Sequence, residues 1–279
     1  MEEVLEKKGV FSELKRDKLL LSLVIIILVL GVYVRFSHYG EESYWNDDMT
    51  TVPTGLLWFY PHNTYPGLAG QGEPALGNYF IGLGCISSGE DFSSVTKISP
   101  MFYPGREILL GEAMTKADRQ CHLPMFIFGI LFFVAICILA LIFLDLYSAT
   151  YVISFFAFFP FLLYLSRWIH VDIIAHTFLA FGLIFLWFFY NSKKYSFKET
   201  VLFSIALVFF SLAFSTKFPM AAFLIFAVFI LLEKYRTESL GLLKMVFVKF
   251  ELKQLAEKIN VISVNYKALF KNLVIGGVF

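Results

Sequence analysis

Long apolar runs alternate with short polar segments along most of the chain. A transmembrane helix needs about 20 predominantly apolar residues to cross ~30 Å of hydrocarbon. The pattern predicts six spans, 13 to 23 residues long, at 19–36, 122–144, 150–165, 173–190, 201–216 and 220–232. A seventh, truncated span is expected to begin in 269–279. The fold class that this pattern predicts is all-α, a multi-pass transmembrane helical bundle.

The composition agrees with a membrane protein. The 279-residue chain is 58% hydrophobic and 16% charged, whereas soluble domains are about 45–50% apolar and about 25% charged. The net charge of +1 gives no basis for a nucleic-acid partner, because nucleic-acid-binding domains carry a basic excess. The positions of the charges along the chain are therefore more informative than their sum.

The basic residues predict the side of the membrane on which each segment lies. Lysine and arginine accumulate in cytoplasmic segments. The N-terminus 1–18 and the loop 191–199 are rich in lysine, so we expect both inside the cell and the long loop 37–121 outside. A span-length apolar stretch follows the basic N-terminus without a small-residue cleavage site, which indicates a retained signal anchor. We expect an integral plasma-membrane protein.

A second basic segment covers 233–268. It contains several lysines, and apolar residues recur in it at helical spacing. One interpretation is a basic amphipathic helix on the inner surface, attracted to anionic membrane lipids. The other is a solvated inner loop whose apolar face packs on the bundle.

The outer loop contains two apolar pieces, 55–60 and 76–86, that are too short to span. Tryptophan and tyrosine are favoured where the membrane meets water, and the pieces are rich in aromatic residues, so we predict interfacial helices. Cys85 and Cys121 fall on the same outer side, where an oxidising compartment would allow a disulfide. Cys137 lies in an apolar run and is expected to pack there.

Carboxylates gather in the same loop. Asp47 and Asp48 are adjacent and follow Trp45. A carboxylate near an apolar surface is harder to ionise, which suits a general base for an acceptor hydroxyl. The alternative is a solvated loop pair. Glu73, which precedes a proline, is either a turn carboxylate or part of a divalent metal site, because carboxylates suit hard cations.

Cations are predicted on the same face. Arg167 could receive a phosphate, because a guanidinium is planar and always charged, or it could form a structural ion pair with Asp172. His170, between them, could assist or be structural. Lys217, at the outer end of the fifth span, is either a second cation for an anionic head group or a snorkelling side chain. A base and two cations fit transfer of a sugar from a lipid phosphate, since the leaving phosphate needs positive charge.

Five sequence elements, in order, resemble those of GT-C class membrane glycosyltransferases, in particular the protein O-mannosyltransferase and aminoarabinose (lipid A) transferase group. The elements are WNDDMTTVP with Asp47 and Asp48, EPALGNYFIGLG with Glu73, DRQCHLPMFIFG with Arg119, SRWIHVD with Arg167 and SLAFSTKFP with Lys217. The resemblance covers most of 19–232 and implies a GT-C-like catalytic region there.

The resemblance also implies roles for individual residues. Asp47, with Asp48 beside it, would activate the acceptor hydroxyl, and Arg167 and Lys217 would hold the donor phosphate. Glu73 would correspond to the carboxylate that helps to bind a metal in part of the group. The donor would be a polyprenyl-phosphate sugar, on a dolichyl or undecaprenyl carrier, and the acceptor a protein, lipid or glycan. The remaining candidates have supporting roles: Trp45, Arg119, His170 and Asp172.

Two other functions fit parts of the pattern. In a transporter or lipid flippase the charges would line a path, but here they cluster at one predicted face, and the spans lack the paired glycine or proline breaks of many transporters. The chain could also be an inactive partner subunit that acts with a second membrane subunit.

Overall fold

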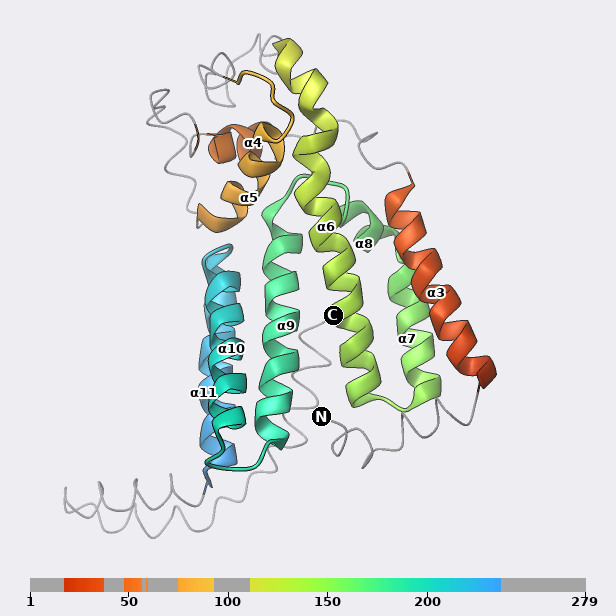
Figure 1. The fold of residues 1–279 in the computed structure, drawn as a ribbon, viewed down its shortest axis with the longest axis vertical. Coiled ribbons are helices and arrows are strands. Elements are labelled where there is room, and N and C mark those ends of the chain that lie inside the picture. Colours follow the sequence, from red (N-terminus) through yellow and green to blue (C-terminus); the bar gives the residue numbers. More distant parts are fainter. Residues whose placement is uncertain (1–17, 38–47, 57–58, 60–74, 93–110, 237–279) are drawn as a thin grey trace, which may run out of the picture.

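The computed structural model describes residues 18–37, 48–56, 59, 75–92 and 111–236. Their regular structure is helical, in agreement with the predicted all-α class (Figure 1). The helices, in chain order, are α3 (Lys18–Phe36), α4 (Asp48–Leu56), α5 (Ala75–Ile86), α6 (Gly111–Phe143), α7 (Leu146–Phe158), α8 (Pro160–Leu165), α9 (Val171–Asn191), α10 (Phe197–Phe214), the 3₁₀ helix η3 (Phe218–Met220) and α11 (Ala221–Lys234).

Four helices of the described chain are long and apolar enough to cross a membrane. They are Lys18–Phe36, Arg119–Phe143, Val171–Asn191 and Phe197–Phe214, close to four of the six predicted spans. These helices identify the chain as a membrane protein by length and composition. Helix α6 begins before its apolar part, at Gly111, and so extends beyond the predicted start of the second span.

The third predicted span differs from the expectation. The segment 150–165 is two helices, because Pro160 lacks the N–H that a continuous helix needs and keeps Phe159 extended, at φ −65° and ψ 116°. The first of them, α7, begins instead at Leu146, where the Asp145 carboxylate accepts a 3.0 Å hydrogen bond from the Ser148 backbone N–H. This bond holds the pKa of Asp145 below its usual range. Helix α11 lies within two residues of the sixth predicted span at both ends and, with 14 residues, is shorter than the four span-length helices.

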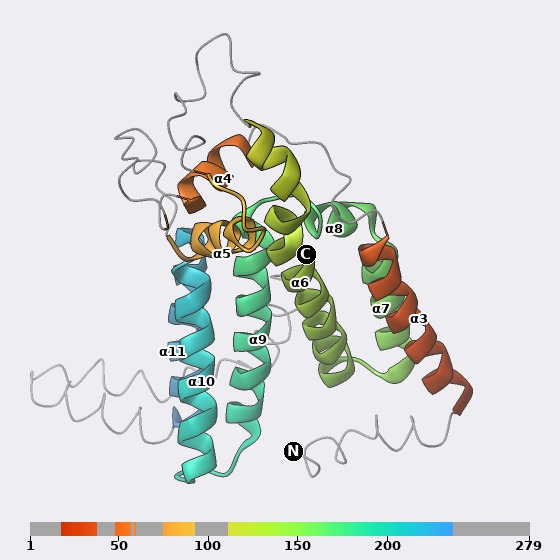
Figure 2. The ribbon, with the colours of Figure 1, turned by 45° about the horizontal axis from the view of Figure 1, so that its top comes forward.

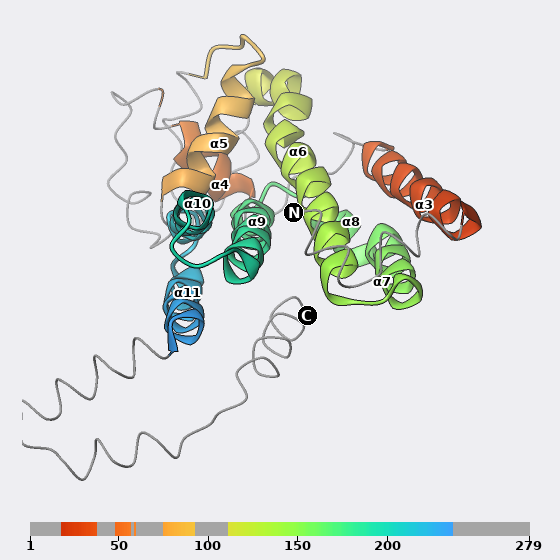
Figure 3. The ribbon, with the colours of Figure 1, turned by 60° about the horizontal axis from the view of Figure 1, so that its bottom comes forward.

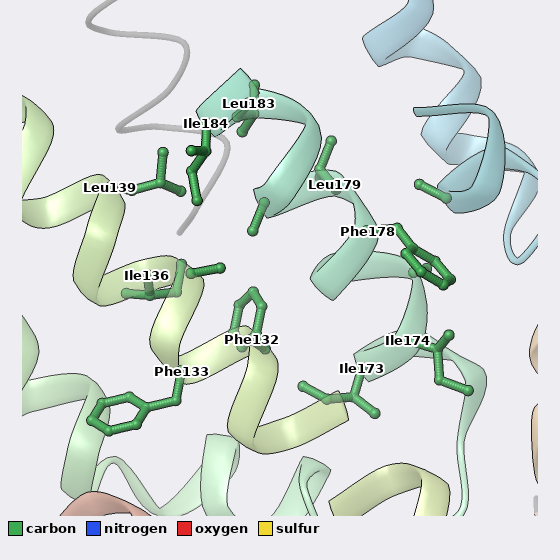
Figure 4. Close-up of a cluster of buried hydrophobic side chains, with 14 of the residues drawn as sticks. Phe132, Phe133, Ile136, Leu139, Ile173, Ile174, Phe178, Leu179, Leu183 and Ile184 are labelled. Carbon is green, nitrogen blue, oxygen red and sulfur yellow. The ribbon is translucent and has the colours of Figure 1, made fainter. Parts of the chain in front are cut away.

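Helix α6 lies at the centre of the bundle, with α7 and α3 on one side and α9, α10 and α11 on the other (Figures 1 and 3). Apolar side chains fill the contact between α6 and α9, where Leu139 and Ile184 point toward one another (Figure 4). Because lipid is as apolar as leucine, such contacts hold membrane helices together chiefly through close packing.

Helices α4 and α5 cover one end of the bundle, where α5 lies across the ends of α9 and α10 (Figure 2). The predicted helix at 76–86 is confirmed as α5. Helix α4 occupies Asp48–Leu56 and overlaps the first two residues of the predicted helix at 55–60, whose residues 57, 58 and 60 lie outside the described residues. The backbones of α4 and α5 touch: a Cβ at Gly55 would lie 2.7 Å from the Gly82 nitrogen.

A disulfide joins α5 to α6 at the same end. It links Cys85 to Cys121, and both residues are fully buried. The structure therefore confirms the pairing that the sequence allowed. The third cysteine, Cys137, is free and buried in α6, as expected.

Candidate functional site

An ion pair joins the ends of α9 and α10 beneath α5. Lys217 follows α10 in an extended conformation, and its ammonium contacts Asp172 Oδ1. The two side chains are 28% and 25% exposed, so the pair is partly accessible. Lys217 is held in place because its backbone N–H donates to Ala213 and its carbonyl accepts from Met220.

His170 completes this group. Its Nδ1 atom is 3.3 Å from the second carboxylate oxygen of Asp172 and 3.3 Å from the Asp172 backbone nitrogen. His170 is the residue that caps the N-terminus of α9, and Asp172 lies in the first turn, where the helix dipole stabilises a negative charge. We call His170, Asp172 and Lys217 the charged cluster. The contact between Asp172 and Lys217 thus joins residues 45 positions apart in the sequence.

Helix α5 packs directly against the chain around the charged cluster. The Leu76 backbone N–H donates to the Ser215 carbonyl at 3.0 Å. Gly77 permits this approach, because a Cβ there would lie 2.6 Å from a Val171 methyl and 2.9 Å from the Thr216 methyl. The element that follows Glu73 in sequence therefore begins beside the residues next to Asp172 and Lys217.

Arg167 is placed elsewhere. Its Nη2 donates to the Val34 carbonyl at 2.7 Å and to the Ser37 carbonyl at 2.9 Å, at the C-terminal end of α3. The predicted ion pair between Arg167 and Asp172 is wrong, because the Asp172 carboxylate faces Lys217 and His170. A cation at the negative end of a helix dipole is favourable, which explains the placement of the guanidinium.

A second arginine, which the sequence did not single out, donates hydrogen bonds to the end of another helix. Arg35 is 1% exposed, and its guanidinium donates to Gly31 at 2.9 Å, to Phe156 at 3.0 Å and to Ala157 at 3.3 Å. The guanidinium also lies 4.3 Å from the Phe133 ring centre. The only sequence signal was an arginine at the end of an apolar run, which snorkelling would equally explain.

His176 was also missed. It lies one turn after Asp172, and its Nδ1 is 2.7 Å from the Asp172 carbonyl oxygen. A carbonyl only accepts, so Nδ1 carries the proton and donates. The ring meets Phe132 edge-on at 6.3 Å. A histidine within an apolar run was the available signal, because polar groups in spans are costly.

A further buried group lies at the opposite end of the bundle. Lys234 Nζ is 2.6 Å from Glu199 Oε1, and both side chains are 4% exposed. Nζ also donates to the Ser192 carbonyl and hydroxyl, each at 3.0 Å. Burial, followed by the hydrogen bond to Glu199, raises the pKa of Tyr235. These contacts join the ends of α9, α10 and α11, and we interpret them as structural.

The other predicted site residues divide into two sets. Asp48 begins α4, and Arg119 is exposed on α6, where the apolar part of that helix starts. Asp47, Trp45 and Glu73 lie outside the described residues. In the part of the chain that the structure describes, no three His, Cys, Asp or Glu side chains are grouped as a metal ion requires.

The fold and the site together define a helical membrane protein with a charged cluster at the α4–α5 end. No protein-family model, curated protein or solved structure matches the chain.

Proposed function

We propose that the protein is a membrane glycosyltransferase of GT-C type. It would move a sugar from a polyprenyl-phosphate donor to a hydroxyl of a protein, lipid or glycan, on the extracytoplasmic side of the plasma membrane. The proposal is compatible with a divalent metal bound at Glu73 and with a second membrane subunit as a partner.

The observation that carries the proposal is the charged cluster. Lys217 follows α10 and Asp172 lies in the first turn of α9, and both are partly accessible at the end where α5 lies across the spans. A lysine ammonium is a compact charge suited to a phosphate group. A donor whose lipid tail stays in the membrane would present its phosphate at such a helix end.

The segment with Asp47 and Asp48 would supply the second group that the reaction requires, a carboxylate base. Asp48 opens α4, α4 contacts α5 through Gly55, and α5 contacts the chain beside Lys217 through Gly77. This series of contacts supports a site in which a carboxylate from the segment and the charged cluster act on one substrate. Asp47 is our candidate for the base, with Asp48 supporting it.

The reaction follows from these groups. Asp47 would take the proton of the acceptor hydroxyl while the hydroxyl oxygen forms a bond to the anomeric carbon. The bond between that carbon and the phosphate oxygen breaks, and its electron pair leaves with the phosphate. Lys217 would stabilise the growing charge on the phosphate, with Arg167 adding positive potential.

The test is a transfer assay on the purified full-length chain in detergent. A panel of radiolabelled polyprenyl-phosphate sugars is supplied with mixed peptide and lipid acceptors, with and without divalent metal. We expect label transfer from at least one donor, and its loss in Asp47→Asn. Transfer that persists in Asp47→Asn would contradict the assignment of the base. Folded wild-type protein that transfers no sugar would contradict the function.

A further inference from the structure

The charged cluster places a carboxylate where it must interact with any anion that binds Lys217. We infer that Asp172 makes the site sensitive to the charge of a bound lipid phosphate and thereby promotes release of the spent carrier. This inference rests on the proposed function, because it takes Lys217 as the phosphate ligand.

The geometry sets the separation of the two negative groups. A lysine ammonium has three donors, and Asp172 Oδ1 occupies one of them. A phosphate oxygen bound to another would lie about 2.8 Å from Nζ. It could therefore be at most roughly 5.6 Å from Oδ1, twice that bond length. At this separation two charges interact appreciably even near a protein surface.

Asp172 is also held in place while a ligand binds. Its backbone N–H donates to His170 Nδ1 at 3.3 Å, which fixes Asp172 at the start of α9. Asp172 lies in the first turn of α9, where the positive end of the helix dipole stabilises its carboxylate. A phosphate would consequently bind beside Asp172 rather than displace it.

The charge of the phosphate changes during the proposed reaction. The sugar-loaded donor is a phosphate diester with a single negative charge. When the glycosidic bond breaks, the carrier keeps the electron pair and becomes a monoester, with a charge of about −1.5 to −2 at pH 7. Lys217 alone would hold this product more tightly than the donor. Repulsion from Asp172 opposes that gain.

Two lipids that have the same tail but differ in the charge of the phosphate test the inference. The probes are a polyprenyl monophosphate and its monomethyl ester, and the readout is displacement of radiolabelled monophosphate from the immobilised full-length chain. We expect Asp172→Asn to tighten monophosphate binding about tenfold more than methyl ester binding, because the lost repulsion acts on the additional charge. Asp172→Glu should restore the wild-type ratio.

Glu90→Gln is the matched control. Glu90 follows the C-terminal end of α5, whereas Lys217 lies near its N-terminal end. Helix α5, which has 12 residues and is about 18 Å long at 1.5 Å per residue, lies between these two positions. Removing this more distant carboxylate should leave the ratio of the two affinities unchanged.

The outcomes separate the inference from the function on which it rests. Equal tightening for both lipids in Asp172→Asn would overturn the inference, since Asp172 would then only compete for Lys217. Loss of binding of both lipids by folded Asp172→Asn would also overturn it. If Lys217→Gln binds both lipids as well as wild type does, the phosphate site itself is wrong, and the proposed function loses its main support.

Discussion

Arg35 shows how a buried arginine can stabilise a helix end inside a membrane protein. Its guanidinium donates to the last carbonyls of α7 from a position on α3, and these carbonyls have no partner within their own helix. The charge is delocalised and faces the Phe133 ring, which reduces the cost of burial. Arg35 therefore joins two helices that are distant in sequence.

Replacing Arg35 with methionine, which keeps most of the length, should lower the free energy of unfolding by about 2–4 kcal/mol, because charged hydrogen bonds are lost and carbonyls are left unpaired. Thermal unfolding in detergent measures the change. Lys198→Met, at an exposed site in the first turn of α10, should change stability by less than about 0.5 kcal/mol. Equal effects of the two variants would show that Arg35 does not join the helices.

The Lys217–Asp172 pair predicts coupled effects on stability. Lys217→Gln leaves a partly buried carboxylate without its cation and should cost roughly 1–3 kcal/mol. The double variant with Asp172→Asn should recover at least half of that loss, because no unpaired charge remains. A double-mutant cycle from thermal unfolding tests this. Strictly additive losses would mean that the two groups do not interact.

The contact between α4 and α5 depends on glycine. A Cβ at Gly82 would overlap the Gly55 carbonyl, which belongs to the backbone and cannot rotate away. We expect Gly82→Ala to push α4 from α5 and to lower transfer at least tenfold, with increased cleavage of α4 by added protease. Leu83→Ala removes a side chain that is 43% exposed and should retain activity. Wild-type behaviour of Gly82→Ala would show that this contact is not required.

The disulfide between α5 and α6 predicts a simple count of thiols. Of the three cysteines, only Cys137 is free. Alkylation of denatured, unreduced protein should therefore label one thiol, and reduction should expose all three. Serine at either Cys85 or Cys121 should destabilise the fold by about 2–4 kcal/mol. Three labelled thiols before reduction would contradict the bridge.

At the scale of the whole molecule, the apolar pattern predicted the long helices well. Span-length apolar runs impose helices, because backbone groups in lipid must be satisfied internally. The predicted helix boundaries were wrong where a local residue sets the end of a helix, as Pro160 and the Asp145 cap do.

The site was predicted less completely. The sequence marked Asp172 and Lys217 as candidates, but their pairing across α9 and α10 depends on the packing of those helices. The role of Arg167 at the end of α3 also depends on a distant contact. Hydrophobic periodicity does not specify such contacts, because it gives the faces of helices and not their partners.

The most direct test of the account is the sidedness of transfer. The full chain would be reconstituted in sealed vesicles whose outer leaflet contains the polyprenyl-phosphate sugar donor, and a membrane-impermeant peptide acceptor would be added outside. Thiol labelling of single cysteines introduced into α5 would report orientation. We predict transfer only in vesicles that have the α4–α5 end outside, and none with Asp47→Asn. Transfer only with the opposite end outside, or none in either orientation, would contradict the account.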